Sequence, residues 1–90
     1  MMTLRELLQK ENITHIPYVE ERERISHKGQ TYDIFTGSFQ IVNGNIKSLD
    51  GDYYSLDMMI EEYSFWEADE NDSICRKGDR CLTVYVESKA

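Results

Sequence analysis

The sequence predicts an α+β domain: a small antiparallel sheet of about five strands with one or two short helices packed on one face. Short β-rich segments alternate with Gly- and Asn-containing turn signals through most of the chain, and two segments carry helical spacing of apolar residues instead. With 90 residues, 40% of them hydrophobic and 30% charged, the chain is expected to form a single small acidic domain over residues 1–90.

The first expected element is a short helix that starts after Thr3. Thr3 and Glu6 have the spacing of a capping box, in which each side chain satisfies a backbone N–H group at the helix start. The apolar residues that follow have the i, i+3, i+4 spacing of one helical face: Leu4, Leu7 and Leu8. Asn12 is the expected end of this helix.

Residues 14–25 are expected to be extended. Pro17 has no N–H group for a β-ladder, so this strand is predicted to lie at a sheet edge or to begin near Pro17. Residues 27–30 (His-Lys-Gly-Gln) have the composition of a hairpin turn, because glycine adopts positive φ without strain.

The next β-rich segments are residues 31–35 and 38–42. Gly37 lies between them and indicates a bulge or a bend. Asn43-Gly44 favours a two-residue type I′ turn, whose twist matches that of paired strands. This turn predicts that 38–42 pairs with a further strand over residues 45–49.

A second helix is expected to begin at Ser55, a good N-cap residue, with Asp57 in its first turn. Apolar residues then follow at helical spacing and predict a core-facing stripe: Leu56, Met59, Ile60 and Tyr63. Beyond it, residues 64–68 and 81–86 are expected to form an antiparallel pair joined by a polar loop over 69–79.

Negative charge is concentrated in one third of the sequence. The formal net charge is −7, and the stretch from Asp50 to Asp72 carries −9, because it holds nine acids and neither Lys nor Arg. The rest of the chain, with eight acids and ten bases, carries +2. The nine acids are Asp50, Asp52, Asp57, Glu61, Glu62, Glu67, Asp69, Glu70 and Asp72.

This acidic stretch predicts a docking surface for a basic protein, with the nine acids and Trp66 as the partner-binding residues. Carboxylates two apart on a strand lie about 7 Å apart, and i, i+4 neighbours on a helix about 6 Å apart. Both spacings resemble those of successive phosphates, so the sequence suggests an inhibitor that occupies the basic surface of a nucleic-acid-handling protein by mimicry. An exposed aromatic residue among acids would suit an Arg partner.

The alternative is a structural or oligomeric module that associates through exposed strand edges, in which the acids serve only solubility. Direct binding of nucleic acid or an anionic membrane is disfavoured by charge repulsion. No apolar run approaches the roughly 18 residues of a membrane span, and residues 1–10 do not have a signal-peptide pattern, so a cytoplasmic location is expected.

Neither a metal site nor an enzyme is predicted. Asp50, Asp52 and Glu61 match three positions of a calcium-binding EF-hand loop, but Tyr54 and Ser55 replace a ligand and the required glycine. The sequence shows no motif that joins a nucleophile to a base, no phosphate-binding glycine loop and no cofactor motif.

The two cysteines do not have the spacing of a zinc site. Cys75 and Cys81 are separated by five residues, unlike the C-x2-C of zinc knuckles. Cys81, in an expected strand, is expected to be a free thiol. A disulfide remains open, because Cys75 lies in the expected loop and can approach Cys81 across the turn, although a disulfide needs an oxidising compartment that no other feature of the sequence supports.

The chain resembles short uncharacterised acidic proteins encoded on bacterial phages and conjugative elements. The resemblance lies in the Thr-x-x-Glu-Leu-Leu start at residues 3–8, in Leu-Asp-Gly-Asp-Tyr-Tyr-Ser-Leu-Asp at 49–57, and in Glu-Tyr at 62–63 and Leu-Thr-Val at 82–84. It implies non-enzymatic accessory work in mobile elements, including inhibition of host nucleic-acid machinery, and it implies no catalytic residue.

Overall fold

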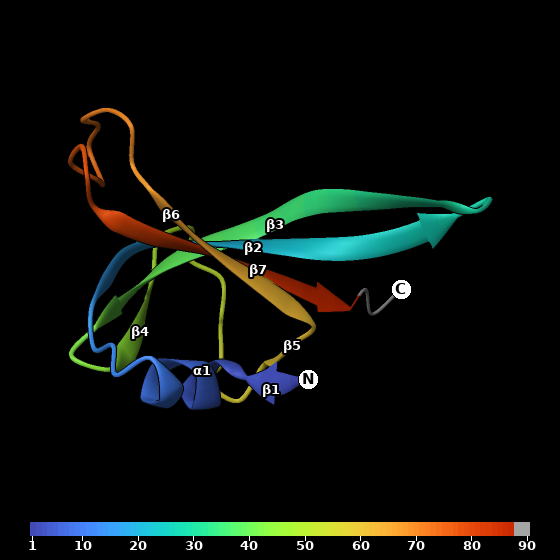
Figure 1. The fold of residues 1–90 in the computed structure, drawn as a ribbon, viewed down its shortest axis with the longest axis horizontal. Helices are drawn as coiled ribbons and strands as arrows, with labels where there is room; N and C mark the ends of the chain where they lie inside the picture. The colour runs from blue at the N-terminus through green and yellow to red at the C-terminus, as the bar shows by residue number, and fades with distance from the viewer. Residues whose placement is uncertain (88–90) are drawn as a thin grey trace.

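The structure, a computed structural model, describes residues 1–87 and contains one helix and seven strands over that range (Figure 1). In chain order the elements are β1 (Met2–Thr3), α1 (Leu4–Lys10), β2 (Ile16–His27), β3 (Gln30–Val42), β4 (Asn45–Ser48), β5 (Met59–Ile60), β6 (Glu62–Glu67) and β7 (Arg80–Glu87). The predicted α+β class is confirmed, with strands as the dominant element.

Five strands form one sheet in the order β4-β3-β2-β7-β6, and β1 pairs with β5 in a separate two-stranded ladder. The predicted sheet was wholly antiparallel, and this is wrong for one pair, because β2 and β7 run parallel. The meander β2–β3–β4 and the hairpin β6–β7 are joined into one sheet by the pairing of β2 with β7. These two strands run in the same direction (Figure 1).

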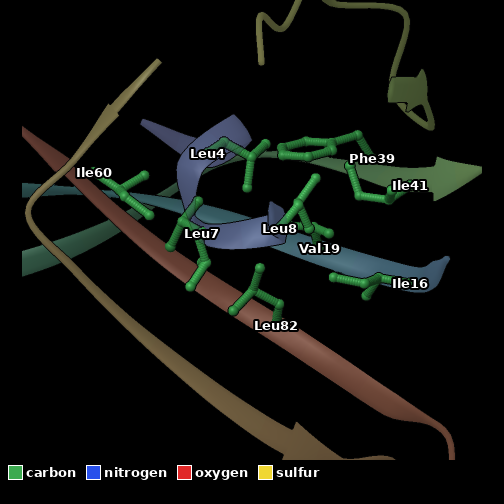
Figure 2. Packing of buried hydrophobic residues seen from close by; sticks show 10 residues of the cluster. Leu4, Leu7, Leu8, Ile16, Val19, Phe39, Ile41, Ile60 and Leu82 are labelled. Atoms are coloured by element: carbon green, nitrogen blue, oxygen red, sulfur yellow. The ribbon is translucent and has the colours of Figure 1, made fainter. Parts of the chain in front are cut away.

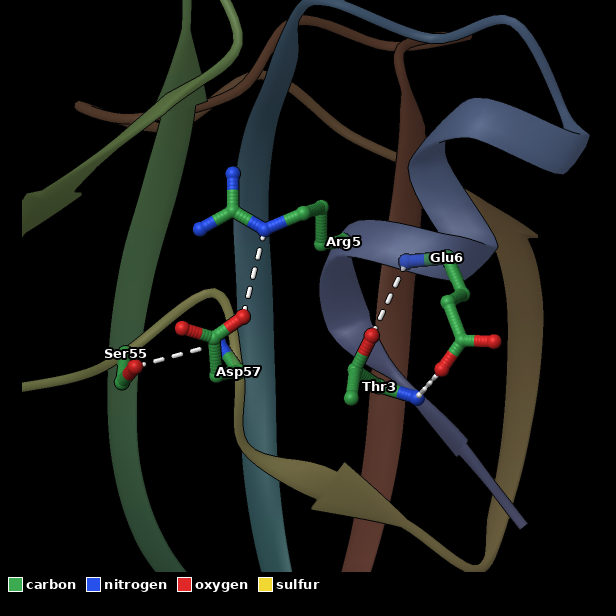
Figure 3. A network of polar contacts seen from close by, with 5 residues as sticks. All are labelled: Thr3, Arg5, Glu6, Ser55 and Asp57. Carbon is green, nitrogen blue, oxygen red and sulfur yellow. Dashed lines mark hydrogen bonds and ion pairs between the residues drawn. The ribbon is translucent and has the colours of Figure 1, made fainter.

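Helix α1 begins with the predicted capping box. The Glu6 N–H donates to Thr3 Oγ1 at 3.1 Å, and the Thr3 N–H donates to Glu6 Oε1 at 3.0 Å (Figure 3). The helix ends at Lys10, and Asn12 adopts the left-handed conformation that often follows a helix, with φ of 54°. α1 is the one helix of residues 1–87, and its seven residues are too few to cross a membrane.

Pro17 lies at the start of a central strand rather than at a sheet edge, so the second of the two predicted positions is confirmed. β2 lies between β3 and β7, and its register against β3 shifts between Ile16 and Val19. The pairing with β7 begins only at Val19, so the missing N–H of Pro17 interrupts neither ladder. The Pro17 carbonyl accepts a hydrogen bond from Gln40 Nε2 at 3.0 Å.

Both predicted hairpin turns are present. Lys28 and Gly29 have φ of 50° and 76°, and Asn43 and Gly44 have φ of 51° and 78°, as type I′ turns require. The irregularity expected at Gly37 is a bulge within a continuous β3, where Glu21 pairs with Gly37 and the next residue of β2 pairs with Phe35.

The predicted second helix is absent, and residues 49–58 cross the sheet as a loop that leads into β5. Ser55 does not cap a helix: its Oγ accepts from the Asp57 N–H at 3.0 Å, and its carbonyl accepts from Met58 N–H at 3.1 Å, which closes a single turn. The more buried residues then alternate with exposed ones, as in a strand: Leu56, Met58 and Ile60.

Backbone contacts with the start of α1 hold this segment extended. The Arg5 N–H donates to the Leu56 carbonyl at 2.8 Å, and the Leu4 N–H donates to the Met58 carbonyl at 3.1 Å. These are N–H groups of the first helical turn, which have no partner inside the helix. Ile60 then pairs with Met2, so the segment and α1 complete each other's hydrogen bonding.

The main core lies between α1, the 49–60 segment and one face of the sheet (Figure 2). Its fully buried residues come from every layer: Leu4, Leu7, Ile16, Val19, Phe39, Ile41, Ile60, Leu82 and Val84. A smaller cluster on the opposite face contains Ala68, Cys75 and Cys81, with Tyr18 packed against it. One face of the sheet is therefore covered by the main apolar core, and the other face carries the smaller cluster that contains both cysteines.

Candidate interaction site

The structure places the predicted partner-binding residues in three regions, and those expected on the second helix lie in a loop and at the start of β6. Figure 1 shows the 68–79 loop and β5 at opposite ends of β6. The loop 49–58 holds Asp50, Asp52 and Asp57; the edge strand β6 and the residue before it hold Glu61, Glu62, Trp66 and Glu67; and the 68–79 loop holds Asp69, Glu70 and Asp72.

Asp50 organises its own loop. Its carboxylate accepts hydrogen bonds from the Asp52 N–H at 2.9 Å, the Ser38 N–H at 3.1 Å, the Ser48 hydroxyl at 3.1 Å and the Tyr54 hydroxyl. The Tyr54 hydroxyl and the Asp52 N–H are the main causes that lower the pKa of Asp50 to about 2. Its acceptor positions are engaged internally, so Asp50 is a structural residue.

Tyr54 connects this loop to the sheet. Its ring lies 4.6 Å from the ring of Phe39, and its hydroxyl accepts the Ser38 N–H at 3.1 Å. Burial, together with the neighbouring Asp50 carboxylate, raises the pKa of Tyr54. Gly37 makes room for this arrangement, because a Cβ there would lie 1.9 Å from the Tyr54 hydroxyl oxygen.

Two more of the predicted residues already have cationic partners. Asp57 lies 3.2 Å from Arg5 Nε (Figure 3), and Glu62 lies 2.8 Å from a guanidinium nitrogen of Arg24. Arg24 also contacts Asp33 at 3.3 Å and stacks over the Tyr85 ring. Exposed pairs of this kind stabilise little, but they occupy the carboxylates that a basic partner would use.

Trp66 lines a hollow at the end of β6 that leads into the 68–79 loop. Its side chain is 37% exposed, and its ring meets that of Tyr18 edge to face, with centroids 6.1 Å apart. Trp66 Nε1 donates to Thr83 Oγ1 at 3.0 Å, which fixes the ring against the sheet. The hollow measures about 360 Å³, and we call it the acidic–aromatic hollow; its lining is Tyr18, Trp66, Ala68, Asp69, Glu70, Asp72, Ile74 and Cys75.

Asp72 shapes the loop that forms the other side of the hollow. Its Oδ1 accepts the Cys75 N–H at 2.6 Å and the Ile74 N–H at 2.7 Å, and these bonds lower the pKa of Asp72. Asp69 and Glu70 are exposed, and within residues 1–87 their carboxylates accept no hydrogen bond and form no ion pair. Their charges therefore remain available to a partner.

The two cysteines lie beneath this loop as free thiols. Their Sγ atoms are 3.7 Å apart, and both side chains are buried. Burial, followed by the hydrogen bond with Cys75, raises the pKa of Cys81 to about 12, so Cys81 is a neutral thiol at physiological pH. Within residues 1–87, no group of three or more His, Cys, Asp or Glu side chains is placed to hold a metal ion.

Tyr18 and Ile74 also line this hollow, and neither was predicted from the sequence. The irregularity between Ile16 and Val19 leaves both of these residues in the main core, so Tyr18, which is next to Val19, faces the opposite side of the sheet, where the hollow lies, and only the strand register reveals that. Ile74 is 42% exposed, and an apolar residue in a polar loop was the available signal. The chain matches no family model, and neither a curated protein nor a solved structure is significantly similar to it.

Proposed function

We propose that this protein is a non-enzymatic acidic interaction module that binds the basic surface of another protein, with the acidic–aromatic hollow as its anchor. The observation that carries the proposal is a partly exposed Trp66 beside two carboxylates, Asp69 and Glu70, that have no partner among residues 1–87. An arginine side chain fits this chemistry, because its guanidinium can stack on the indole while the carboxylates neutralise it.

Two physical effects support the anchor. A cation over an indole ring contributes roughly 0.5–2 kcal/mol, depending on how far the pair is desolvated. Trp66 is already held by Thr83 and Tyr18, so little side-chain freedom remains to be lost on binding. The −9 charge of residues 50–72 adds a longer-range field that accelerates encounter with a cationic partner.

The partner class proposed within this function is a nucleic-acid-handling protein, whose basic groove the acidic module would occupy as an inhibitor. Asp57 and Glu61 lie in a loop and a bend instead of on a helix, so these carboxylates do not have the i, i+4 helical spacing that resembles successive phosphates. The net charge and the partly exposed Trp66 support this partner class instead. It is tested by displacement of a labelled DNA duplex from a basic DNA-binding protein, which the wild-type chain should achieve and a hollow variant should not.

The anchor itself can be tested with a short arginine peptide as the probe. Trp66 is the one tryptophan of the chain, so its fluorescence reports directly on the hollow. We expect a saturable change with an oligoarginine peptide, weaker binding of an oligolysine peptide of equal charge, and a steep loss of affinity with added salt.

A pair of matched variants separates the anchor from general charge. Asp69→Asn with Glu70→Gln should weaken peptide binding about tenfold, because both residues line the hollow together with Trp66. Asp52→Asn with Glu61→Gln removes the same charge away from the hollow and should have a much smaller effect. Equal losses in the two double variants, or no fluorescence change with the wild type, would contradict the proposed anchor.

A further inference from the structure

The β2–β3 hairpin extends beyond the rest of the sheet as a two-stranded arm (Figure 1). The ladder with β7 reaches only to Arg24 of β2, and the ladder with β4 begins only at Phe39 of β3. Residues 25–35, which we call the arm, therefore have only each other as strand neighbours among residues 1–87. One consequence is that no strand in the described part of the chain pairs with the outer edge of β3 over 30–35.

This edge is unusually apolar for an exposed strand. Tyr32, Ile34 and Phe35 are 47%, 47% and 51% exposed. Tyr32 pairs with Ile25 across the arm, and Ile34 lies two residues further along on the same face. Exposed strand edges are normally blunted by Lys, Pro or a bulge, and here the bulge comes only after Phe35.

The turn determines which backbone groups point outward from this edge. His27 and Gln30 flank a two-residue turn, so they form a hydrogen-bonded pair, and hydrogen-bonded pairs alternate with open ones along the arm. The outward N–H and C=O groups of β3 therefore belong to Thr31, Asp33 and Phe35. They form a regular row that another strand can pair with.

Charge selects the partner. The molecule carries a formal charge of −7, but the arm contains one base, Lys28, and one acid, Asp33. Asp33 is moreover paired with Arg24 at 3.3 Å. Because the arm has no net charge, it does not repel an identical arm. An approach through the acidic loops would instead bring the −9 segments of two molecules together, and their like charges repel each other.

We propose that two copies of this chain pair through the outer edges of β3, antiparallel about a twofold axis at Ile34. In this register Asp33 exchanges backbone hydrogen bonds with Phe35 of the second copy, and the two Ile34 side chains lie directly opposite each other. A register centred on Asp33 would oppose two carboxylates, which cross-strand pairing disfavours. The contact is small, so the dimer forms in a concentration-dependent equilibrium.

Sedimentation of the purified chain tests the proposal. Over about a thousandfold range of protein concentration, the wild-type chain should pass from monomer to dimer. Ile34→Lys and Ile34→Glu should each weaken the dimer by about tenfold or more, because each variant opposes two like charges at the axis. An equimolar mixture of the two variants should restore dimer formation, because Lys then faces Glu.

The matched control is Ile74→Lys, which changes another exposed isoleucine and the net charge by the same amount, but in the 68–79 loop. It should dimerise like the wild type, and circular dichroism should show that all the variants remain folded. A wild type that stays monomeric over the whole range, an Ile74→Lys that loses the dimer equally, or a mixture that fails to rescue would each overturn the proposal. Salt dependence distinguishes dimer formation from peptide binding at the hollow. The dimer should persist at a salt concentration that abolishes binding of the arginine peptide.

Discussion

The same two strands, β2 and β3, form both the covered part of the sheet and the exposed arm. Beneath α1 their inward residues, Val19, Phe39 and Ile41, are fully buried, whereas Ile34 and Phe35 in the arm are half exposed. β2 and β3 remain paired through both parts, and the register shifts at two positions. The comparison shows that turn chemistry and β propensity are enough to continue a hairpin, while burial requires the second layer that α1 and residues 49–60 supply.

Alanine substitution of the two phenylalanines should give the largest difference between the regions. Phe39→Ala leaves a cavity in the main core and should cost about 3–5 kcal/mol of unfolding free energy. Phe35→Ala removes a half-exposed ring and should cost about 0.5 kcal/mol or less. Urea denaturation of both variants measures the difference, and similar losses would mean that the arm is as tightly packed as the core.

Gly37→Ala tests the boundary between the two regions. Its Cβ would lie 1.9 Å from the Tyr54 hydroxyl oxygen, so the ring must move off Phe39 and the Asp50 network must loosen. Overpacking of this kind should cost about 1–3 kcal/mol in urea denaturation. In a Tyr54→Ala background the same substitution should lower the free energy of unfolding little further. If the loss were as large there as in the wild type, it would come from the backbone at residue 37 and not from contact with the Tyr54 ring.

The Asp50 network should give the protein a stability component that acid removes. The pKa of Asp50 is lowered to about 2 in the folded chain, below its ordinary value, so folding favours the carboxylate form. This contribution is fully present above about pH 4 to 5 and is lost as the pH falls toward 2. Asp50→Asn should lower the melting temperature at neutral pH and flatten its dependence in this acid range.

Asp52→Asn is the matched control for that measurement. Asp52 is exposed, and within residues 1–87 its carboxylate accepts no hydrogen bond and forms no ion pair. Its removal should leave the acid dependence of the melting temperature close to that of the wild type. An equal change in the two variants would attribute the effect to net charge instead of to the bonds at Asp50.

The smallest expected effect concerns the turns at the two ends of β3. The arm turns at Lys28-Gly29 and the covered part at Asn43-Gly44, and lysine tolerates the required positive φ less well than asparagine. Lys28→Asn should therefore stabilise the arm by a few tenths of a kcal/mol. Slower amide exchange of arm residues measures this gain, and unchanged exchange would mean that the turn does not limit arm opening.

Features determined by neighbouring residues could be predicted from the sequence. The capping box of Thr3 and Glu6, the type I′ turn at Asn43-Gly44 and the hairpin turn at residues 27–30 depend on short-range chemistry. The β6–β7 pairing was also predicted, from two β-rich segments joined by one polar loop. The second helix was predicted wrongly because residues 56–63 fit helical spacing while Leu56, Met58 and Ile60 also fit strand alternation. Hydrogen bonds from α1 and β1, far away in the chain, decide between them.

For the candidate site, the sequence predicts the excess of acidic residues but not their arrangement in space. The excess of acids in residues 50–72 was evident, but which acids are available depends on partners from elsewhere in the fold. Asp57 is occupied by Arg5 and Glu62 by Arg24, and both pairs are distant in sequence. Tyr18, opposite Trp66, becomes part of the hollow through strand register alone.

The parallel ladder between β2 and β7 has a consequence for the order of assembly. Val19 pairs with Phe39 on one side and with Leu82 on the other, so one neighbour is local while the other comes from a much later part of the chain. During synthesis, the β2–β3–β4 meander can form while the inner edge of β2 is still unpaired. Since long-range strand pairing is slow, this transient edge is where a newly made chain is most exposed to misassembly.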